Sequence, residues 1–148
     1  KLVCAHNENG TQQGQTAGGT GSAWMYDFDN STGTVSNALL LEAGVSFYGV
    51  AFSQDSKKVY LSGNNSVRQF DLDATDISAS KTIVFSGFSF IGAMQLAPNG
   101  KIYICNTSNS QALDVINMPA AVGAACGYQE DGQALPRGRS AGARNNLQ

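Results

Sequence analysis

The chain has 148 residues, which fits one domain, and its charged fraction of 14% is low for a soluble globular protein. Gly, Ser, Asn, Gln and Thr take the place of charged residues, which is typical of many short strands joined by polar turns. A formal net charge of −2 argues against a nucleic-acid or anionic-membrane partner, and no apolar run approaches the roughly 20 residues of a membrane span.

The N-terminal residues predict a strand followed by a long loop. Residues 1–7 resemble residues 58–64, so we predict a strand here that is the second of its sheet. Residues 8–21 are rich in Gly, Gln and Thr and lack a strand pattern, which predicts a flexible loop. Residues 22–29 resemble residues 66–73 and predict a further strand.

An internal repeat organises the rest of the chain. Residues 48–61 return as residues 92–104, with Phe52 aligned with Leu96 and therefore 44 positions apart. The resemblance of residues 22–29 to residues 66–73 gives the same spacing, and residues 112–116 form a weaker third copy. A period in the forties made of strands is typical of β-propeller blades, each a four-stranded antiparallel sheet. We therefore predict an all-β protein with about three propeller blades.

The strands of the complete copy follow from alternation and turn chemistry. We predict strands at residues 49–52, 58–62, 67–73 and 81–85, with turns at residues 53–56 and 63–65. In the next copy the turn at residues 98–100 contains Asn99 and Gly100, which we expect to supply the positive φ angles of a tight hairpin.

The repeat divides the chain into blades of one propeller domain. Residues 1–47 form a partial first blade with its long loop, residues 48–91 a second blade, and residues 92–148 a third blade and a C-terminal tail. A closed propeller has four to eight blades, so we expect further blades or other chains to complete it. Because the chain begins at Lys1 without an initiator Met or signal sequence, we expect a processed product or a fragment. In isolation it should expose apolar blade faces and aggregate or oligomerise.

Several polar residues are candidates for chemistry. Paired carboxylates could act in acid/base catalysis or bind calcium, but these pairs recur in two blades and favour a structural role at strand ends; they are Asp27 with Asp29 and Asp71 with Asp73. Asp55 and Asn99 occupy equivalent turns, where such side chains bond nearby backbone amides. His6 is the only histidine, and without a G-x-S-x-G motif we favour a structural or surface role for it.

The aromatic residues at or beside repeat positions favour packing between blades, with a carbohydrate-stacking platform as the alternative; they are Trp24, Tyr26, Tyr48, Tyr60, Phe70 and Tyr103. The glycine-rich residues 17–21 lack the Lys of a phosphate loop and indicate a linker. The C-terminal arginines, Arg137, Arg139 and Arg144, favour a solvated end over a binding patch.

The three cysteines do not form a metal motif with His6. Cys4 and Cys105 fall on second strands two blades apart, which is too far for a disulfide. Cys126 could reach Cys105, and three buried thiols are the alternative.

The chain resembles a known group of propellers. The sequences YGVAFSQDSKKVY (48–60), VRQFDL (67–72), MQLAPNGKIYI (94–104), LDVINMP (113–119) and GAACGY (123–128) are similar to blades of large proteins exported by the type IX secretion system of gliding and related bacteria. Many of those proteins end in a type B sorting domain, which this chain lacks, and residues 141–146 replace the usual GLPNF segment. The resemblance implies a secreted or cell-surface protein and supplies no catalytic residues.

These observations together predict a non-enzymatic binding, adhesion or scaffolding module without metal or organic cofactor. Its partners would be other blades or chains of the same propeller and a surface protein or glycan. The alternative is a propeller lactonase or hydrolase with a metal in the central channel, but the predicted inner strands at residues 49–52 and 92–96 carry no acid. No ligand-binding residue is identified, although the loop at residues 8–21, with Trp24 and Tyr26 beyond it, is where we would look first.

Overall fold

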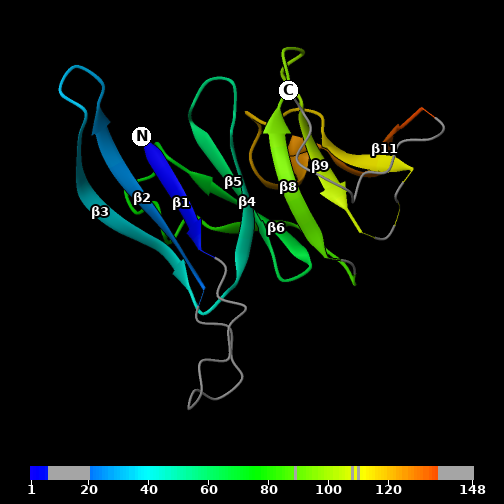
Figure 1. Cartoon of the computed structure of the whole chain (residues 1–148), viewed down its shortest axis with the longest axis horizontal. Helices are drawn as coiled ribbons and strands as arrows, with labels where there is room; N and C mark the ends of the chain where they lie inside the picture. Colours follow the sequence, from blue (N-terminus) through cyan, green and yellow to red (C-terminus); the bar gives the residue numbers. More distant parts are fainter. Residues whose placement is uncertain (7–20, 89, 108, 110, 137–148) are drawn as a thin grey trace.

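The computed structural model describes residues 1–6, 21–88, 90–107, 109 and 111–136. These residues form three antiparallel sheets that follow one another along the chain and from left to right in Figure 1. Outside the sheets, the described residues contain one short 3-10 helix, η1 (Gly123–Cys126). None of the helical structure described is long and apolar enough to cross a membrane. The prediction of an all-β fold is confirmed.

Sheet 1 has three strands in the order β1-β2-β3, with β1 at Leu2–His6, β2 at Ser22–Asp29 and β3 at Thr34–Ala43. The first two strands agree with the sequence prediction, whereas β3 was not predicted. The predicted loop at residues 8–21 lies almost wholly outside the described residues, as do the C-terminal arginines.

Sheet 2 has four strands in the order β4-β5-β6-β7, at Phe47–Phe52, Lys58–Gly63, Ser66–Asp71 and Thr82–Ser86. All four were predicted, but the third was predicted to run to Asp73. It ends at Asp71 because the Asp71 carboxylate accepts a hydrogen bond from the Asp73 amide at 3.1 Å, which turns the chain. Asn64 and Asn65 have φ angles of 44° and 59°, so the β5–β6 hairpin has the twist of a two-residue turn with both central residues left-handed.

Sheet 3 has the order β8-β9-β10-β11, with strands at Ile91–Leu96, Ile102–Asn106, Ala112–Ile116 and Tyr128–Ala134. The fourth strand, β11, was not assigned from the sequence. In the β8–β9 turn, Gly100 alone of the Asn99–Gly100 pair has a positive φ, at 78°. The Asn99 backbone does not take a positive φ, and the Asn99 side chain serves the turn by accepting a hydrogen bond from the Lys101 amide.

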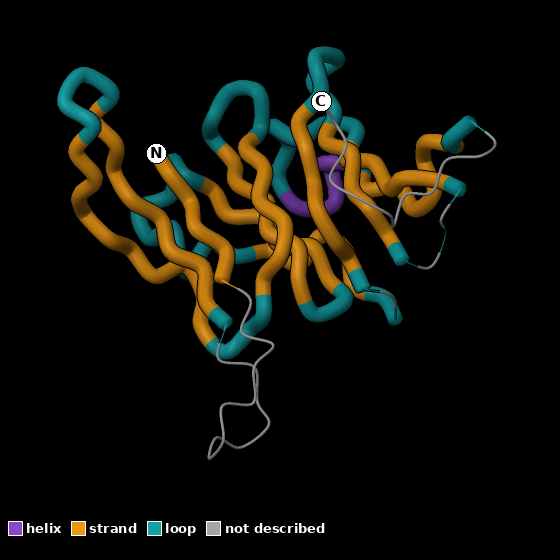
Figure 2. The backbone as a smooth tube through the Cα atoms, viewed as in Figure 1, coloured by secondary structure: helices purple, strands orange, loops and turns teal. Residues whose placement is uncertain are grey.

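The core lies between the sheets, and sheet 2 is covered on both faces (Figure 2). Side chains alternate along its strands, so Val59, Leu61 and Phe70 pack against sheet 1 while Tyr60 and Val67 pack against sheet 3. Strand β5 is buried along its whole length for this reason. Each sheet is thus stabilised mainly by the sheet beside it.

Candidate functional site

Strand register places corresponding residues of the three sheets in the same positions. Each sheet has two such pairs of opposed residues, on β1 and β2 in sheet 1, on β5 and β6 in sheet 2, and on β9 and β10 in sheet 3. In sheets 1 and 2 these side chains point away from the following sheet. The pairs are Leu2–Tyr26 and Cys4–Trp24 in sheet 1, Val59–Phe70 and Leu61–Arg68 in sheet 2, and Ile102–Ile116 and Ile104–Asp114 in sheet 3. In sheets 2 and 3 these side chains pack on the preceding sheet.

The burial of these positions differs sharply between the sheets. The eight side chains in sheets 2 and 3 are at most 8% exposed. In sheet 1, Leu2 is 42% exposed, Cys4 is exposed, and Trp24 and Tyr26 are half-buried. We call these four residues the outward face of sheet 1. This face has the same register positions as the buried faces of sheets 2 and 3, but no described sheet covers it.

The edge of sheet 1 is open as well. Strands β5 and β9 each pair with a strand on both sides, β5 with β4 and β6, and β9 with β8 and β10. In the described part of the chain, β1 pairs only with β2, although it holds the position of β5 and β9. Its other edge therefore presents backbone N–H and C=O groups that a further strand could pair with.

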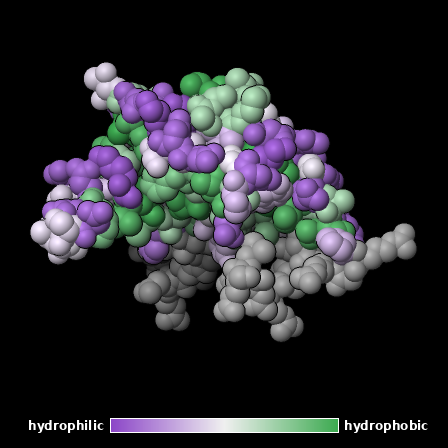
Figure 3. Space-filling view, turned by 90° about the horizontal axis from the view of Figure 1, so that it is seen from above, coloured by the Kyte–Doolittle hydropathy of each residue, from purple (hydrophilic) through white to green (hydrophobic). Residues whose placement is uncertain are grey.

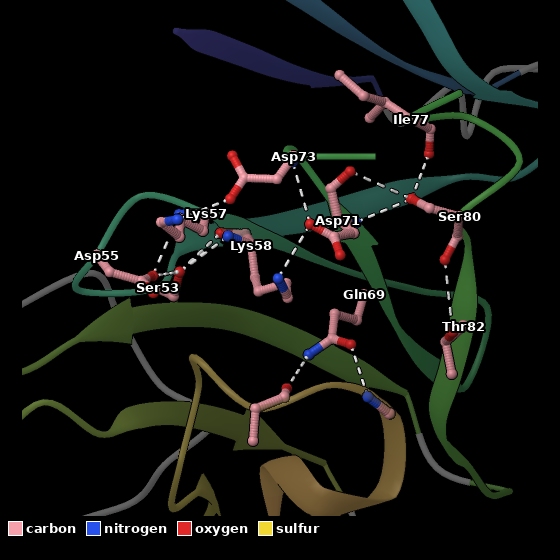
Figure 4. A network of polar contacts seen from close by, with 12 residues as sticks. Ser53, Asp55, Lys57, Lys58, Gln69, Asp71, Asp73, Ile77, Ser80 and Thr82 are labelled. Atoms are coloured by element: carbon pink, nitrogen blue, oxygen red, sulfur yellow. Dashed lines mark hydrogen bonds and ion pairs between the residues drawn. The ribbon is translucent and has the colours of Figure 1, made fainter. Parts of the chain in front are cut away.

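The paired carboxylates are structural contacts at strand ends (Figure 4). Lys58, on β5, donates from Nζ to Asp71 Oδ1 at 3.0 Å, while Lys57 pairs with Asp73 at 2.8 Å. In sheet 1 Lys1 pairs with Asp27. The hydrogen bond from Lys58 lowers the pKa of the Asp71 carboxyl, and the bond from Lys1 lowers that of Asp27. Such carboxylates are held ionised and are poor general acids.

The remaining pair members and turn residues act locally, as predicted. Asp29 accepts hydrogen bonds from the backbone and hydroxyl of Ser31, which lower the pKa of its carboxyl. Asp55 accepts from the Lys57 amide at 3.2 Å, and Asn99 accepts from the Lys101 amide at the same distance. The prediction that Asp55 and Asn99 stabilise equivalent turns is confirmed.

The predicted aromatic residues divide into buried and exposed ones. Tyr60 and Phe70 are fully buried between sheets, which confirms the packing role predicted for them. Tyr103 is half-buried on the far side of sheet 3, like Trp24 and Tyr26 on sheet 1. Tyr48 is 51% exposed, yet its ring meets Phe90 at the start of sheet 3 edge to face, so it keeps a contact between sheets at a partly open surface. A bulge between Phe47 and Gly49 interrupts the alternation and turns Tyr48 outward.

The cysteines and His6 are not gathered into one site. The three thiols are free; Cys4 is exposed, while burial raises the pKa of the Cys105 and Cys126 thiols. His6 ends β1 and is exposed. Across the described ranges, no three His, Cys, Asp or Glu side chains lie close enough together to hold a metal ion.

Buried polar contacts hold strands together both between sheets and within sheet 3, and the sequence analysis missed them. Arg68 meets Glu42 of sheet 1 with 3.0 Å between Nε and Oε2, and it lies 5.3 Å from the centroid of the Phe47 ring. In sheet 3, the fully buried Asp114 accepts hydrogen bonds from Asn106 and from the hydroxyl of Tyr128. Isolated charges inside strand patterns were the available signal, but the sequence does not name their partners, Glu42 from sheet 1 for Arg68 and neighbouring strands of sheet 3 for Asp114.

Gln69 forms a second buried contact between sheets, here between sheet 2 and the segment before β11 (Figure 4). Its amide nitrogen donates to Ala121 O at 2.7 Å and to the Tyr60 hydroxyl at 2.5 Å, and its amide oxygen accepts from the Gly123 backbone at 2.8 Å. Tyr60 in turn donates to Pro119 O at 2.9 Å. These bonds fasten the segment before β11 to the face of sheet 2.

Charge is divided between the two ends of the strands. The turns after β2, β4, β6 and β8 lie at the end seen in Figure 3, where hydrophilic side chains form several patches separated by apolar surface. This charged end includes Lys1, Asp29, Asp55, Lys57, Asp73, Asp76 and Lys101, whereas Lys81 pairs with Glu42 beside residue 43. At the opposite end lie residues 43–47, 63–66, 86–91 and 106–112, whose described members include no Asp, Glu, Lys or Arg. We call this the uncharged end.

No protein-family model matches the chain, and no curated protein is significantly similar to it. The resemblance to propellers of type IX-exported proteins therefore stays a prediction.

Proposed function

We propose that the chain is part of a β-propeller and serves as a non-enzymatic binding or scaffolding module of a secreted or cell-surface protein. The observation that carries the proposal is the outward face of sheet 1. Its four side chains hold register positions whose counterparts in sheets 2 and 3 are buried by a preceding sheet. A further sheet of the same kind is the surface that fits it, because the sheet 1–sheet 2 interface already shows how two such sheets pack.

The open edge of β1 supports the same proposal. A strand paired there would complete sheet 1 to four strands, matching the order of sheets 2 and 3. Four-stranded antiparallel sheets stacked in chain order are the units of a propeller, and a ring of them needs at least four. The additional sheets would come from further chain or from other copies. The secreted or surface location rests on the family resemblance alone.

A binding role fits the site better than the propeller lactonase or hydrolase. The inner strands β4 and β8 carry no acidic residue that could hold a metal or act as a base. The carboxylates of Asp27, Asp71 and Asp73 are engaged with Lys1, Lys58 and Lys57. These three acids therefore stabilise strand ends.

Sedimentation velocity on the chain tests the proposal. We expect species larger than the 15.5 kDa monomer. Leu2→Asp should shift the distribution toward monomer, because a carboxylate buried in a sheet interface is costly. Val122→Asp is the matched control, since Val122 is 61% exposed and lies just before η1, between β10 and β11, away from sheet 1. A wild-type monomer with one cooperative melting transition would refute the proposal.

A further inference from the structure

The uncharged end carries a group of exposed aromatic rings. Tyr48 is 51% exposed, Phe90 is 40% exposed and Phe88 is fully exposed. Tyr48 belongs to the first strand of sheet 2, and the two phenylalanines precede the first strand of sheet 3. The rings thus lie where two neighbouring sheets begin, on the side that would face the axis of a propeller. Exposed apolar groups concentrated in one place indicate a binding surface.

Two of the rings are held in a fixed arrangement. Tyr48 and Phe90 meet edge to face, with 6.0 Å between ring centroids and an interplanar angle of 74°. The carbonyl of Phe90 accepts hydrogen bonds from both the amide and the hydroxyl of Thr107, each at 3.2 Å. The segment that carries Phe90 is therefore tied to the end of β9. Ring faces positioned in this way lose little conformational entropy when a ligand covers them.

Amide and hydroxyl groups surround the rings. The Gly87 amide donates to Asn65 O at 2.9 Å, which places the β5–β6 turn beside the segment carrying Phe88. Asn64 and Asn65 are exposed in that turn, and Thr107 is exposed at the end of β9. Asn side chains both donate and accept hydrogen bonds, as does the Thr hydroxyl.

We propose that the uncharged end binds a neutral saccharide, with the rings of Tyr48 and Phe90 as the stacking surface; this rests on the proposed function as a binding module. The C–H face of a pyranose packs on an aromatic ring, and its hydroxyls need partners that donate and accept. The flanking Asn and Thr side chains meet that need. Arg68 and Glu42 adjoin this end, but they are nearly buried and pair with each other, so they offer an anionic or cationic ligand no open ion-pair partner.

Isothermal titration of the folded chain with cellohexaose, laminarihexaose, mannohexaose and xylohexaose tests this proposal. We expect at least one to bind with a Kd below about 1 mM. Tyr48→Ala and Phe90→Ala should each weaken that binding by about tenfold. Phe28→Ala, which removes an exposed aromatic ring at the other end, should leave binding unchanged. Raising the salt about tenfold should also have no effect, because no charge pair is made.

The experiments distinguish a failure of the proposed saccharide site from a failure of the proposed propeller assignment. No binding of the four hexasaccharides, or binding that survives both Tyr48→Ala and Phe90→Ala, overturns the saccharide site. Binding to a purified surface protein that requires Tyr48 and Phe90, with none to the sugars, also overturns it and assigns the rings to a protein partner. In each case self-association measured by sedimentation remains the separate test of the propeller. A chain that stays monomeric but binds one of the sugars would support the saccharide site and refute the proposal that the chain is part of a propeller.

Discussion

Lys58 donates to Asp71 across neighbouring strands at 3.0 Å, and the same contact recurs at the same register position in the other two sheets. Lys1 pairs with Asp27 in sheet 1, and Lys101 donates to Asn117 at 2.8 Å in sheet 3. The three sheets therefore share this lysine contact at a matching place in their strand order. The contact clamps the end of the second strand to the end of the third.

The Lys58–Asp71 ion pair should contribute more to the stability of the fold than the exposed Lys57–Asp73 pair beside it. Lys58 has 8% of its side chain exposed, so its stem packs in the interior while its ammonium group meets Asp71. Lys58→Ala should lower the melting temperature by roughly 5 °C. Lys57→Ala is the control, because the Lys57–Asp73 pair is more than half exposed and should leave the melting temperature nearly unchanged. Equal losses in the two variants, measured by circular dichroism at matched concentration, would refute the distinction.

The lowered carboxyl pKa values predict sensitivity to acid. Hydrogen bonds to the carboxylates of Asp27, Asp29, Asp55 and Asp71 hold each pKa below its unfolded value. Their contribution is complete above the unfolded pKa of about 3.9 and is lost as the pH falls through the folded values. The free energy of unfolding in urea should therefore be level above about pH 5 and fall below about pH 4. Asp71→Asn should reduce that fall, and a decline that is already complete at pH 5 would contradict this assignment.

Gly49 should not tolerate a side chain. A Cβ atom there would lie 2.7 Å from Gly92 O and 2.5 Å from Ser62 Oγ, because β4 and β8 approach closely at this point. Gly49→Ala should cost about 1–3 kcal/mol in the free energy of unfolding. At Gly92 the nearest atoms to a new Cβ are 3.5 Å away or more, so Gly92→Ala is a matched control that should be tolerated. If neither substitution lowers the free energy of unfolding in urea, β4 and β8 must lie further apart at Gly49 than this structure places them.

Removing the Gln69 amide should loosen the contact between sheets 2 and 3. Gln69→Leu leaves the Gly123 amide and the Ala121 carbonyl without the hydrogen bonds that Gln69 gives them, at a cost of about 3 kcal/mol. Hydrogen exchange at Gly123 should also become faster. Gln95→Leu provides the control, since Gln95 is exposed on β8. Unchanged exchange at Gly123 in the Gln69 variant would show that this bond does not hold the segment.

The strands of sheet 2 could be predicted because their apolar residues alternate and their turns contain Asn, Asp and Gly. Strand β11 could not, since its sequence YQEDGQA has no apolar alternation and depends on pairing with β10. Strand β3 was missed for a related reason: Leu39, Leu40 and Leu41 are consecutive, which hides the alternation. Such strands form because a neighbour supplies the hydrogen bonds, and a single sequence does not name that neighbour.

The turn contacts of Asp55 and Asn99 were predictable because they are local. The Arg68–Glu42 pair was not, because it depends on how sheet 1 stacks on sheet 2. The exposure of Tyr48 follows from a bulge that leaves no mark in the residue pattern. The division of charge between the two ends also required strand order before the turns could be assigned to an end.

The alkylation rate of Cys4 tests most directly whether another sheet covers the outward face. Cys4 lies on that face and is exposed, while Cys126 is fully buried, its thiol pKa is raised by burial, and it serves as the internal reference. Rates are measured by mass spectrometry as protein concentration rises from about 1 µM to about 100 µM. Progressive protection of Cys4, with Cys126 slow throughout, is the predicted result. A Cys4 rate that stays constant and fast over this range would contradict the proposal.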